Sequence, residues 1–551
     1  MHRLRVVPAA LPGRLHRSGR TAAGLRAAQA RAHSHPGPRR VSQASADFRL
    51  HDFHGGLALD GHKAVSLEVP LASAGLPERV YVPIGQHQGE AGDLLLGPGD
   101  QVLAGQALTS SADDFEVPAH APCSGTVVGL CERPASHPPG SRRRCIEILN
   151  DGRDEWVAPT PLKHWAECPS GKIVDHLHAM GLVGLGGAMF PTAAKLRGPW
   201  GAIHTLILNG AECEPWISCD EMLMRTRPEA VIRGGQVLAA AVAAERVIIA
   251  VEDDMDGIAD ALKKALAQQH GSLEMVIVEV PSVYPQGGER QLIETLTGLQ
   301  VPGDGLPQDI GLLCHNVATA AAASDAVVHG RPLTERIVTV TGPGIQRPCN
   351  LRAAVGTPVA HLVAAAGGYR DGVQRLVLGG PMSGTALSSD EVVLTKGSHC
   401  VLALTDQELA PRPEPMPCIN CGDCVAVCPA SLMPQLLFRA LAADRHEQAR
   451  DLSLLECIEC GCCAQVCPSQ IPLVDYYRHG KARLGLKDLD QRRAALAKRR
   501  YEAREQRLAQ QQADREARRR ARAERLQKAG GARDEIQAAI ERAKAKKRSG
   551  D

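Results

Sequence analysis

Near the carboxyl end of the chain, the pattern C-x2-C-x2-C-x3-C-P occurs twice, at residues 418–429 and 457–468. In such a run, a tight loop brings three thiolates to three corners of an iron–sulfur cubane, while the fourth cysteine reaches across to the other cluster. The two runs therefore predict one ferredoxin domain that holds two [4Fe-4S] clusters and moves single electrons.

The crossing rule also predicts which cysteines share a cluster. One cluster takes Cys418, Cys421, Cys424 and Cys467, and the other takes Cys457, Cys460, Cys463 and Cys428. Cys462 is left over and is predicted to be a bystander. Structural zinc is the alternative, but a zinc site usually uses paired C-x2-C knuckles and gives no reason for a third cysteine and a proline in each run.

The composition limits the other classes of protein. A chain of 551 residues is too long for one core, so we expect several compact units. The formal net charge of +2 gives no overall attraction to nucleic acid, and no nucleic-acid partner is predicted. The 18 cysteines do not suggest a disulfide framework, because the start of the chain lacks the apolar run of a signal peptide. No run approaches the roughly eighteen apolar residues of a membrane-spanning helix.

A glycine-rich stretch, GLVGLGGAMFPTAAKL, offers a second kind of chemistry at residues 181–196. Gly184, Gly186 and Gly187 allow close approach of a ligand to the backbone, and a helix is predicted to begin at FPT. Free N–H groups at a helix start, together with Lys195 one turn later, suit a phosphate. On local grounds a tight structural turn is an equal alternative.

Three further loops carry polar side chains, and two of them, NGAECEPWISCD and YPQGGERQLI, follow predicted strands, where α/β folds bind ligands. They supply Asn209, Glu212, Glu214, Tyr284, Glu289, Asn316 and Thr319. Glu212 and Glu214 are candidates to hold ribose hydroxyls or to repel a second phosphate, with ordinary loop acids as the alternative. The residues of HNVAT are equally consistent with helix caps.

The whole is predicted to be an α/β multidomain chain. Residues 161–332 alternate between helix and strand, with HTLILNG, RVIIAVED and LEMVIVEV as buried parallel strands of an α/β core. Residues 47–160 form a β-rich module that resembles the barrel-sandwich fold of lipoyl and biotinyl carriers. Asp113–Phe115 occupy the turn where those carriers present lysine, so the module is predicted to be structural and not to carry a cofactor on a swinging arm. Residues 333–400 predict a β-grasp-like module of the SLBB type.

The remaining segments are the ferredoxin domain and two tails. The ferredoxin domain takes residues 410–485, with a helical insert between its two cysteine runs. Residues 486–551 predict a charged helical or disordered tail. Its long helical stretch is predicted to end at Gly530–Gly531 and has too few leucines for a strong coiled coil. Docking of this tail on a partner or an anionic surface stays open. Residues 1–46, rich in arginine and free of acids, are predicted to be a disordered basic extension or an upstream translation start, although they superficially resemble a transit peptide.

Five ordered motifs together resemble RnfC, also called RsxC, a peripheral component of the Rnf ion-translocating electron transport complex. They are GLGGAMFPTAAKL, NGAECEPWISCD, YPQGGERQLI, HNVATAAA and the doubled cysteine pattern, and the resemblance runs from about Phe53 to Leu484. The core is also similar to the NADH-binding flavoprotein subunit of complex I. That subunit carries a single cluster in the segment where this chain has two cysteine runs, which favours RnfC.

The resemblance implies FMN as a cofactor and NADH as a substrate. It places Gly184, Gly186, Gly187, Lys195, Asn209, Asn316 and Thr319 around FMN, and Glu212, Glu214, Tyr284 and Glu289 toward the nicotinamide and ribose. Because electron transfer needs no general acid or base, no catalytic side chain is predicted.

The implied function is that of an oxidoreductase and translocase subunit. Electrons would pass between NADH and ferredoxin, or another carrier, through FMN and the two clusters, while integral membrane and iron–sulfur partner subunits couple the flow to ion movement. The chain would lie peripherally on the cytoplasmic face of the bacterial inner membrane. Two alternatives stay open: a soluble flavin-dependent NADH dehydrogenase or hydrogenase subunit, and a non-catalytic iron–sulfur scaffold that binds neither FMN nor NADH.

Overall fold

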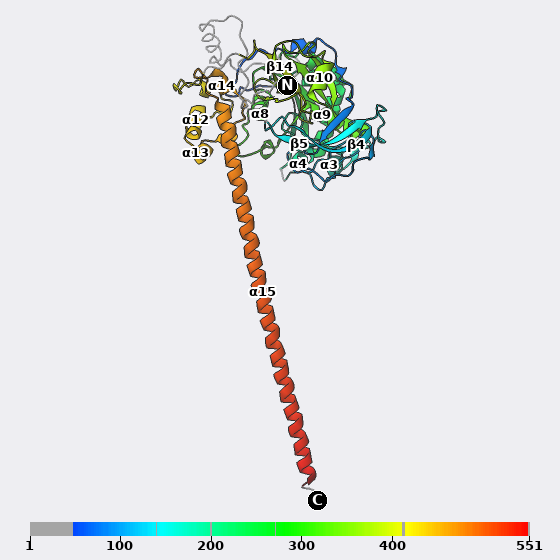
Figure 1. Cartoon of the computed structure of the whole chain (residues 1–551), viewed down its shortest axis with the longest axis vertical. Helices are drawn as coiled ribbons and strands as arrows, with labels where there is room; N and C mark the ends of the chain where they lie inside the picture. The colour runs from blue at the N-terminus through cyan, green and yellow to red at the C-terminus, as the bar shows by residue number, and fades with distance from the viewer. Residues whose placement is uncertain (1–47, 139, 199–200, 270, 410–413, 549–551) are drawn as a thin grey trace, which may run out of the picture. The chain divides into compact units, whose positions relative to one another are not determined.

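The computed structural model describes residues 48–138, 140–198, 201–269, 271–409 and 414–548 (Figure 1). The chain divides into two compact units that meet between Arg478 and His479, and each unit is described by itself. The predictions for residues 1–46 lie outside the described part of the chain.

A four-stranded parallel sheet forms the centre of the α/β core, in the order β8-β7-β6-β9. Its strands are β6 Thr205–Gly210, β7 Arg246–Glu252, β8 Glu274–Val280 and β9 Leu312–Asn316. The predictions of β6 and β7 as buried parallel strands are confirmed, whereas β8 is parallel but lies at the edge of the sheet and is mostly half-buried. The sequence contains no signal for β9, because LLCHN has no β-branched or large aromatic residue.

Helices pack on both faces of this sheet. Alternate residues of β6 point to opposite faces, so that Leu206 and Leu208 join one hydrophobic cluster and Ile207 joins another. The helices of the core are α3 Ser170–Ala179, α4 Thr192–Arg197, α5 Cys219–Thr226, α6 Pro228–Val242, α7 Ile258–Ala267, α8 Glu289–Thr297 and α9 Val317–His329. Helices α6 and α9 lie so close that a Cβ atom at Gly234 would stand 1.7 Å from the carbonyl oxygen of Ala320, and only glycine fits there.

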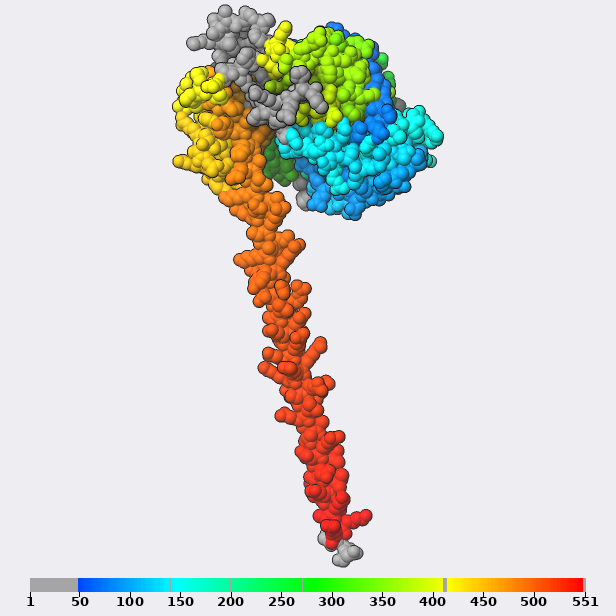
Figure 2. Space-filling model, viewed as in Figure 1, coloured from blue at the N-terminus to red at the C-terminus, as the bar shows by residue number. Residues whose placement is uncertain are grey.

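The β-rich module has an antiparallel sheet in the order β2-β5-β4-β3. Its strands are β2 Arg79–Pro83, β3 Gln101–Val102, β4 Gly125–Pro134 and β5 Arg142–Asn150. The turn predicted to be structural is tied to the core, since Arg197 donates to Asp114 at 2.5 Å. Figure 2 shows this module, in blue and cyan, on the same face of the molecule as the green SLBB-type module.

The predicted β-grasp-like module is a six-stranded mixed sheet in the order β1-β11-β10-β14-β12-β13. Its elements are β1 Ala72–Ser73, β10 Glu335–Thr341, β11 Cys349–Ala354, α10 Val359–Ala365, β12 Val373–Leu378, β13 Thr385–Ala386 and β14 Cys400–Thr405. Strand β1 comes from the amino-terminal segment and pairs with β11, so that segment helps to hold the modules together.

The ferredoxin domain consists of short helices around the cysteine runs. They are α11 Asp423–Ala426, α12 Pro434–Ala442, α13 His446–Asp451, α14 Cys462–Val466 and the start of α15 Leu473–Arg548. The predicted helical insert is present as α12 and α13, which are separated by Asp444 with a φ angle of 58°. The other short elements of the described chain are α2 Ala64–Leu67, η1 Trp165–Glu167, η2 Pro307–Ile310 and η3 Leu454–Glu456.

The second unit is the continuation of helix α15 to Arg548 (Figure 1). The prediction that the helix ends at Gly530–Gly531 is wrong, because α15 runs through both glycines. Each glycine costs only about 1 kcal/mol relative to alanine, and strong helix formers surround the pair. None of the described helices combines the length and the apolar character that crossing a membrane requires.

Lys396 is a buried lysine that joins three modules of the first unit. Its Nζ donates to the carbonyl oxygens of Pro118 in the β-rich module, at 3.1 Å, and of Gly181 in the core, at 2.7 Å. The side chain is buried, with a relative exposure of 2% for the residue, and burial lowers the pKa of Lys396 to about 7. The contact therefore stabilises the assembly of the modules in a manner that depends on pH.

The stability of the wild type is expected to rise with pH relative to a Lys396→Met variant. In the folded state the pKa of Lys396 is about 7, whereas an unfolded lysine has a pKa of about 10.4. Between these two values the folded state binds fewer protons than the unfolded state, so the free energy of unfolding rises by up to about 1.4 kcal/mol per pH unit. Thermal unfolding at about pH 7 and pH 9 measures it, with Lys172→Met, at an exposed site in α3, as the control. Identical pH dependence in the wild type and Lys396→Met would contradict the assignment.

Candidate functional site

The eight predicted cluster cysteines line two separate hollows in the ferredoxin domain. Cys418, Cys421, Cys424 and Cys467 line the first hollow. Cys428, Cys457, Cys460 and Cys463 line the second. The structure thus brings together the same two quartets that the crossing rule predicts, each with its fourth sulfur taken from the other cysteine run.

Two repeats of the same backbone geometry shape the loops around these hollows. Asn420 and Glu459 each have a φ angle of 57°, and Gly422 and Gly461 have φ angles of 86° and 82°. Each glycine precedes a short helix, α11 or α14. Left-handed backbone at these points lets a short loop fold back, so that its cysteines face a common centre.

The surroundings of the sulfurs fit iron–sulfur clusters. The second hollow is lined mostly by apolar side chains, with Tyr477 and Glu459 among its few polar ones. Backbone N–H groups donate to sulfur, from Leu432 to Cys428 at 3.3 Å and from Glu459 to Cys457 at 3.4 Å. Such hydrogen bonds help to stabilise thiolate ligands. Cys462 lines neither hollow and packs instead with Tyr284 and Met382.

The two hollows differ in their position relative to the α/β core. The hydroxyl of Tyr284 donates to the carbonyl oxygen of Cys460 at 2.8 Å, and Gln291 donates to that of Pro429 at 3.0 Å. Both contacts fall on the half of the ferredoxin domain that surrounds the second hollow. Beside the first hollow, Cys421 is exposed and Ile419 is 66% exposed. One quartet therefore lies against the core and the other is open to solvent.

Lys195 lies near the carboxyl edge of the parallel sheet, in the helix that its motif predicts. Helix α4 carries it, and its Nζ donates to Glu289 at 2.8 Å and to the carbonyl oxygen of Cys314, in β9, at 2.7 Å. The Lys195 side chain is 22% exposed and that of Glu289 is 39% exposed. The ammonium group is thus held in place by an acid and a carbonyl oxygen on a side chain that is partly exposed.

Asparagines from two neighbouring strands form the next part of this edge. The Asn209 amide donates to the carbonyl oxygen of Gly287 at 2.8 Å, and Asn316 caps α9 by accepting from the N–H of Ala318. Asn316 is therefore a helix cap, as the alternative interpretation of HNVAT predicted. Its Nδ2 donates to Asp220 at 2.5 Å.

The glycine loop lies against the same asparagines. A Cβ atom at Gly186 would stand 3.3 Å from Cβ of Asn316, while one at Gly187 would meet open space. The hydroxyl of Thr319 accepts from the N–H of Leu185 at 2.9 Å. The loop therefore offers a glycine surface beside an amide-lined edge with a nearby cation, which fits a flavin phosphate and ring.

Glu214 and Tyr284 lie toward the SLBB-type module and the ferredoxin domain. Glu214 accepts from the N–H groups of Met382, at 2.6 Å, and Ser383, at 3.0 Å. Burial raises the pKa of Glu214, while these donors oppose the rise. The hydrogen bonds of Glu214 and Tyr284 thus join the core to its neighbouring modules.

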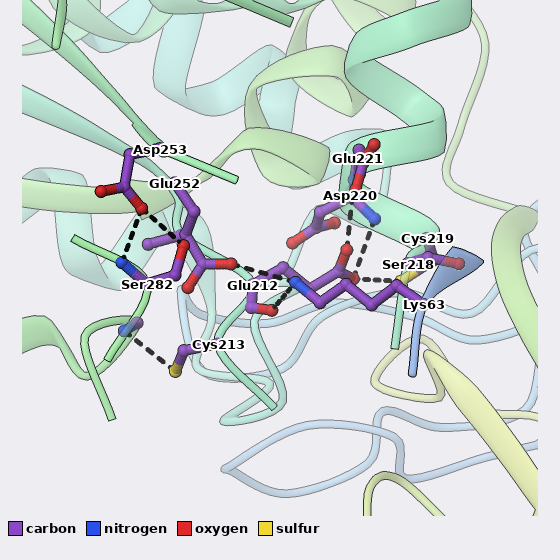
Figure 3. Close-up of polar contacts among 12 residues, drawn as sticks. Lys63, Glu212, Cys213, Ser218, Cys219, Asp220, Glu221, Glu252, Asp253 and Ser282 are labelled. Carbon is purple, nitrogen blue, oxygen red and sulfur yellow. Dashed lines mark hydrogen bonds and ion pairs between the residues drawn. The ribbon is translucent and has the colours of Figure 1, made fainter. Parts of the chain in front are cut away.

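Glu212 belongs to a buried polar network that sequence reasoning missed (Figure 3). Its carboxylate accepts from the N–H groups of Asp220 at 3.0 Å and Glu221 at 3.2 Å, at the start of α5. Burial, with the charge of Asp220, raises the pKa of Glu212 to about 8. Glu212 is therefore a structural acid and not an ordinary surface residue of the loop.

Lys63 is the cation of this network. Its Nζ donates to the carbonyl oxygen of Glu212 at 2.5 Å and to Glu252 at 3.0 Å (Figure 3). Burial alone would lower the pKa of Lys63, but the charges of Glu252 and Glu212 outweigh it and raise that pKa, so the ammonium stays charged. No motif points to Lys63, because its partners lie 149 and 189 positions away in the sequence.

Four family models match successive parts of the chain. Residues 51–153 match the RnfC barrel sandwich hybrid domain and residues 177–325 match the Nuo51 FMN-binding domain. Residues 337–386 match the SLBB domain and residues 417–471 match the 4Fe-4S dicluster domain. The predicted multidomain α/β architecture is confirmed.

Similar proteins are named as the C subunit of an ion-translocating oxidoreductase complex. The one from Erwinia tasmaniensis is 43% identical, over 85% of this chain and 58% of its own length. Those from Serratia proteamaculans and Pseudomonas aeruginosa are 42% and 45% identical, over 90% and 91% of this chain and 70% and 66% of their own lengths. The chain thus spans 58% to 70% of these three relatives.

Among solved structures, the NAD+-reducing [NiFe]-hydrogenase in the H2-reduced state aligns with a TM-score of 0.40 and 20% identity, covering 58% of this chain and 64% of that chain. This likeness is too weak to carry an argument. The relatives and the domain matches show that the chain belongs to the RnfC family of ion-translocating oxidoreductase complexes, with an FMN-binding domain and a 4Fe-4S dicluster domain.

Proposed function

We propose that this chain passes electrons between NADH and an iron–sulfur partner of an ion-translocating complex, with FMN and two [4Fe-4S] clusters as its cofactors. One observation carries the proposal. Two quartets of cysteines line separate hollows, and one quartet lies against a core that matches an FMN-binding domain. When bound, FMN supplies the exchange between paired and single electrons, and the clusters carry single electrons.

Each quartet would hold one cluster. Cys418, Cys421, Cys424 and Cys467 would ligate the cluster in the first hollow, and Cys428, Cys457, Cys460 and Cys463 the cluster in the second. The hydrogen bond from Tyr284 to the carbonyl oxygen of Cys460 holds the second hollow at a fixed place on the core. Tyr284 is therefore proposed to position the loop.

The carboxyl edge of the parallel sheet would hold FMN. Gly184, Gly186 and Gly187 would leave room for the cofactor, and Asn209, Asn316 and Thr319 would line it. The Lys195 ammonium would attract the phosphate. Glu289, which holds Lys195, would lie on the side where NADH enters. Glu212, Glu214 and Tyr284 would shape this side through the contacts that they make with other segments.

The partners and the location are part of the proposal. The relatives are named for ion translocation, which requires a membrane, so we infer integral membrane and iron–sulfur partner subunits and a peripheral position on the cytoplasmic face. Ferredoxin or a similar carrier is the proposed electron partner. The exposed side of the first hollow, next to Cys421 and Ile419, is where electrons would leave or enter.

Replacing Lys195 with glutamate is expected to weaken FMN binding at least tenfold. The change removes the proposed charged hydrogen bond from Lys195 to the FMN phosphate, which is worth about 1.5–3 kcal/mol. It also puts a second carboxylate beside Glu289, where Lys195 now donates, and this negative charge repels the phosphate. Equilibrium dialysis of FMN against anaerobically purified protein measures the affinity. Lys195→Gln is expected to fall between the wild type and Lys195→Glu.

Lys172→Glu is the matched control, because it makes the same charge change at an exposed site of the same core. It is expected to bind FMN like the wild type. An unchanged FMN affinity in Lys195→Glu would contradict the assignment of the FMN site to the carboxyl edge of the parallel sheet. Iron–sulfur clusters without any FMN or NADH binding in the wild type would instead support the scaffold alternative.

A further inference from the structure

The second unit carries a charge opposite to that of the first. Residues 479–548 contain 23 lysines and arginines and 10 acidic residues. The described range of the first unit, residues 48–478 with its gaps, spans 31 basic and 49 acidic residues of the sequence. The net charge of +2 for the whole chain therefore hides a strongly basic helix.

The basic residues of this helix are not spread evenly around it. At about 100° per residue, positions eighteen apart stand on one line along the helix. Leu486, Arg504, Arg522 and Ile540 mark such a line on α15. We define the arginine face as the sector within about 80° of this line, over residues 486–548.

The arginine face collects positive charge and every large apolar side chain of this stretch. It holds 13 of the 21 basic residues but 2 of the 10 acids, whereas the opposite side holds 8 of each. All eight leucine, isoleucine and tyrosine residues between Leu486 and Ile540 fall on the arginine face. From Leu489 to Arg548 every residue with a described side chain is exposed (Figure 2). One side of the helix is thus cationic and partly apolar, and the other is neutral.

We propose that the arginine face binds the surface of an anionic phospholipid membrane. Lipid phosphates attract guanidinium groups, and the interfacial region also accepts leucine, isoleucine and tyrosine side chains, which here stand among the arginines. The acidic residues on the opposite side would point away from the membrane. A bilayer surface offers both negative charge and an apolar layer along the whole length of a helix.

Two other partners fit this face less well. A coiled-coil partner needs an apolar residue at every third or fourth position, but no large apolar residue occurs between Leu508 and Leu526. A nucleic acid duplex offers phosphates but no layer that would receive the apolar side chains. The membrane is also required by the ion translocation for which the relatives are named, although the charge pattern does not depend on that name.

Vesicle binding of the full chain tests the proposal. Vesicles of phosphatidylcholine with phosphatidylglycerol are expected to bind the protein, and vesicles of phosphatidylcholine alone are not. Replacing Arg504, Arg515, Arg518 and Arg522 with glutamine is expected to weaken the partition at least a hundredfold, because each basic residue near such a surface contributes about fivefold. Binding is also expected to disappear at about 1 M salt, where the Debye length is about 3 Å.

A matched variant removes the same charge from the opposite side of the helix. Lys498, Arg499, Arg520 and Arg542 are replaced with glutamine in this control, which is expected to keep most of the vesicle binding. Equal losses in the two variants, or no binding of the wild type to phosphatidylglycerol vesicles, would overturn the proposal. Tighter binding to duplex DNA than to these vesicles would overturn it in favour of a nucleic acid. None of these outcomes changes the iron or FMN content, so a failure here stays distinct from a failure of the proposed function.

Discussion

The Cys467→Ser variant is expected to lose about half of the protein's iron, and to lose it from the cluster of the other cysteine run. Cys467 belongs by sequence to the run that begins at Cys457, but it lines the hollow of Cys418, Cys421 and Cys424. A [4Fe-4S] cluster is normally held by four thiolates and serine is a weaker ligand, so removal of one thiolate should destabilise this cluster and release up to four of eight iron atoms. Iron and sulfide assays after anaerobic purification measure the loss.

Double variants reveal which cluster is lost. Cys421→Ser added to Cys467→Ser should cost no more iron, because both residues line the first hollow. Cys460→Ser added to Cys467→Ser should remove almost all iron, because Cys460 lines the second. Cys462→Ser is the matched control, since Cys462 lies in the same run but lines neither hollow. The reverse pattern of losses would show that each run ligates its own cluster.

Replacing Lys63 with methionine is expected to destabilise the α/β core by about 3–5 kcal/mol, because breaking a buried ion pair leaves the remaining charge desolvated. The variant leaves Glu252 buried without its cation, and the Glu252 side chain is only 1% exposed. Because burial raises the pKa of Glu252 to about 7, the loss applies above this pH, where the wild-type carboxylate is ionised, and it becomes smaller at lower pH as Glu252 takes up a proton. The fall in the thermal unfolding midpoint, measured by calorimetry without oxygen, reports the effect.

A second substitution separates the loss of the ion pair from the loss of packing. Lys63→Met combined with Glu252→Gln should recover a large part of the stability, because no unpaired charge is left in the core. Lys264→Met removes an exposed lysine of α7 and should leave the midpoint almost unchanged. If the double variant is as unstable as Lys63→Met alone, Lys63 acts through packing and not through its charge.

Local patterns were enough to predict which cysteines line each hollow and three of the four strands of the core. Cluster ligands repeat at fixed spacings, because a short loop has few ways to bring three sulfurs to one centre. Strands β6, β7 and β8 are short apolar runs rich in β-branched residues. Strand β9 is as buried as β6 and β7 but lacks that composition, so its place depends on its neighbours in the sheet.

Contacts between distant segments could not be predicted in this way. Lys63 resembles any surface lysine in the sequence, and only the fold brings it to Glu212 and Glu252. No local pattern indicates that the hydroxyl of Tyr284 donates to the carbonyl oxygen of Cys460 in the ferredoxin domain. The prediction of a helix end at Gly530–Gly531 is wrong for another reason, because a local signal for the end of a helix is outweighed by the helix formers around it.

We propose that eight thiolates hold two [4Fe-4S] clusters next to an FMN-binding core. The decisive experiment is paramagnetic resonance of the anaerobically purified chain after reduction with dithionite. We expect the signals of two reduced [4Fe-4S] clusters in a protein that contains about eight iron atoms per chain. A protein that carries zinc in place of iron, and stays silent in this measurement, would contradict it.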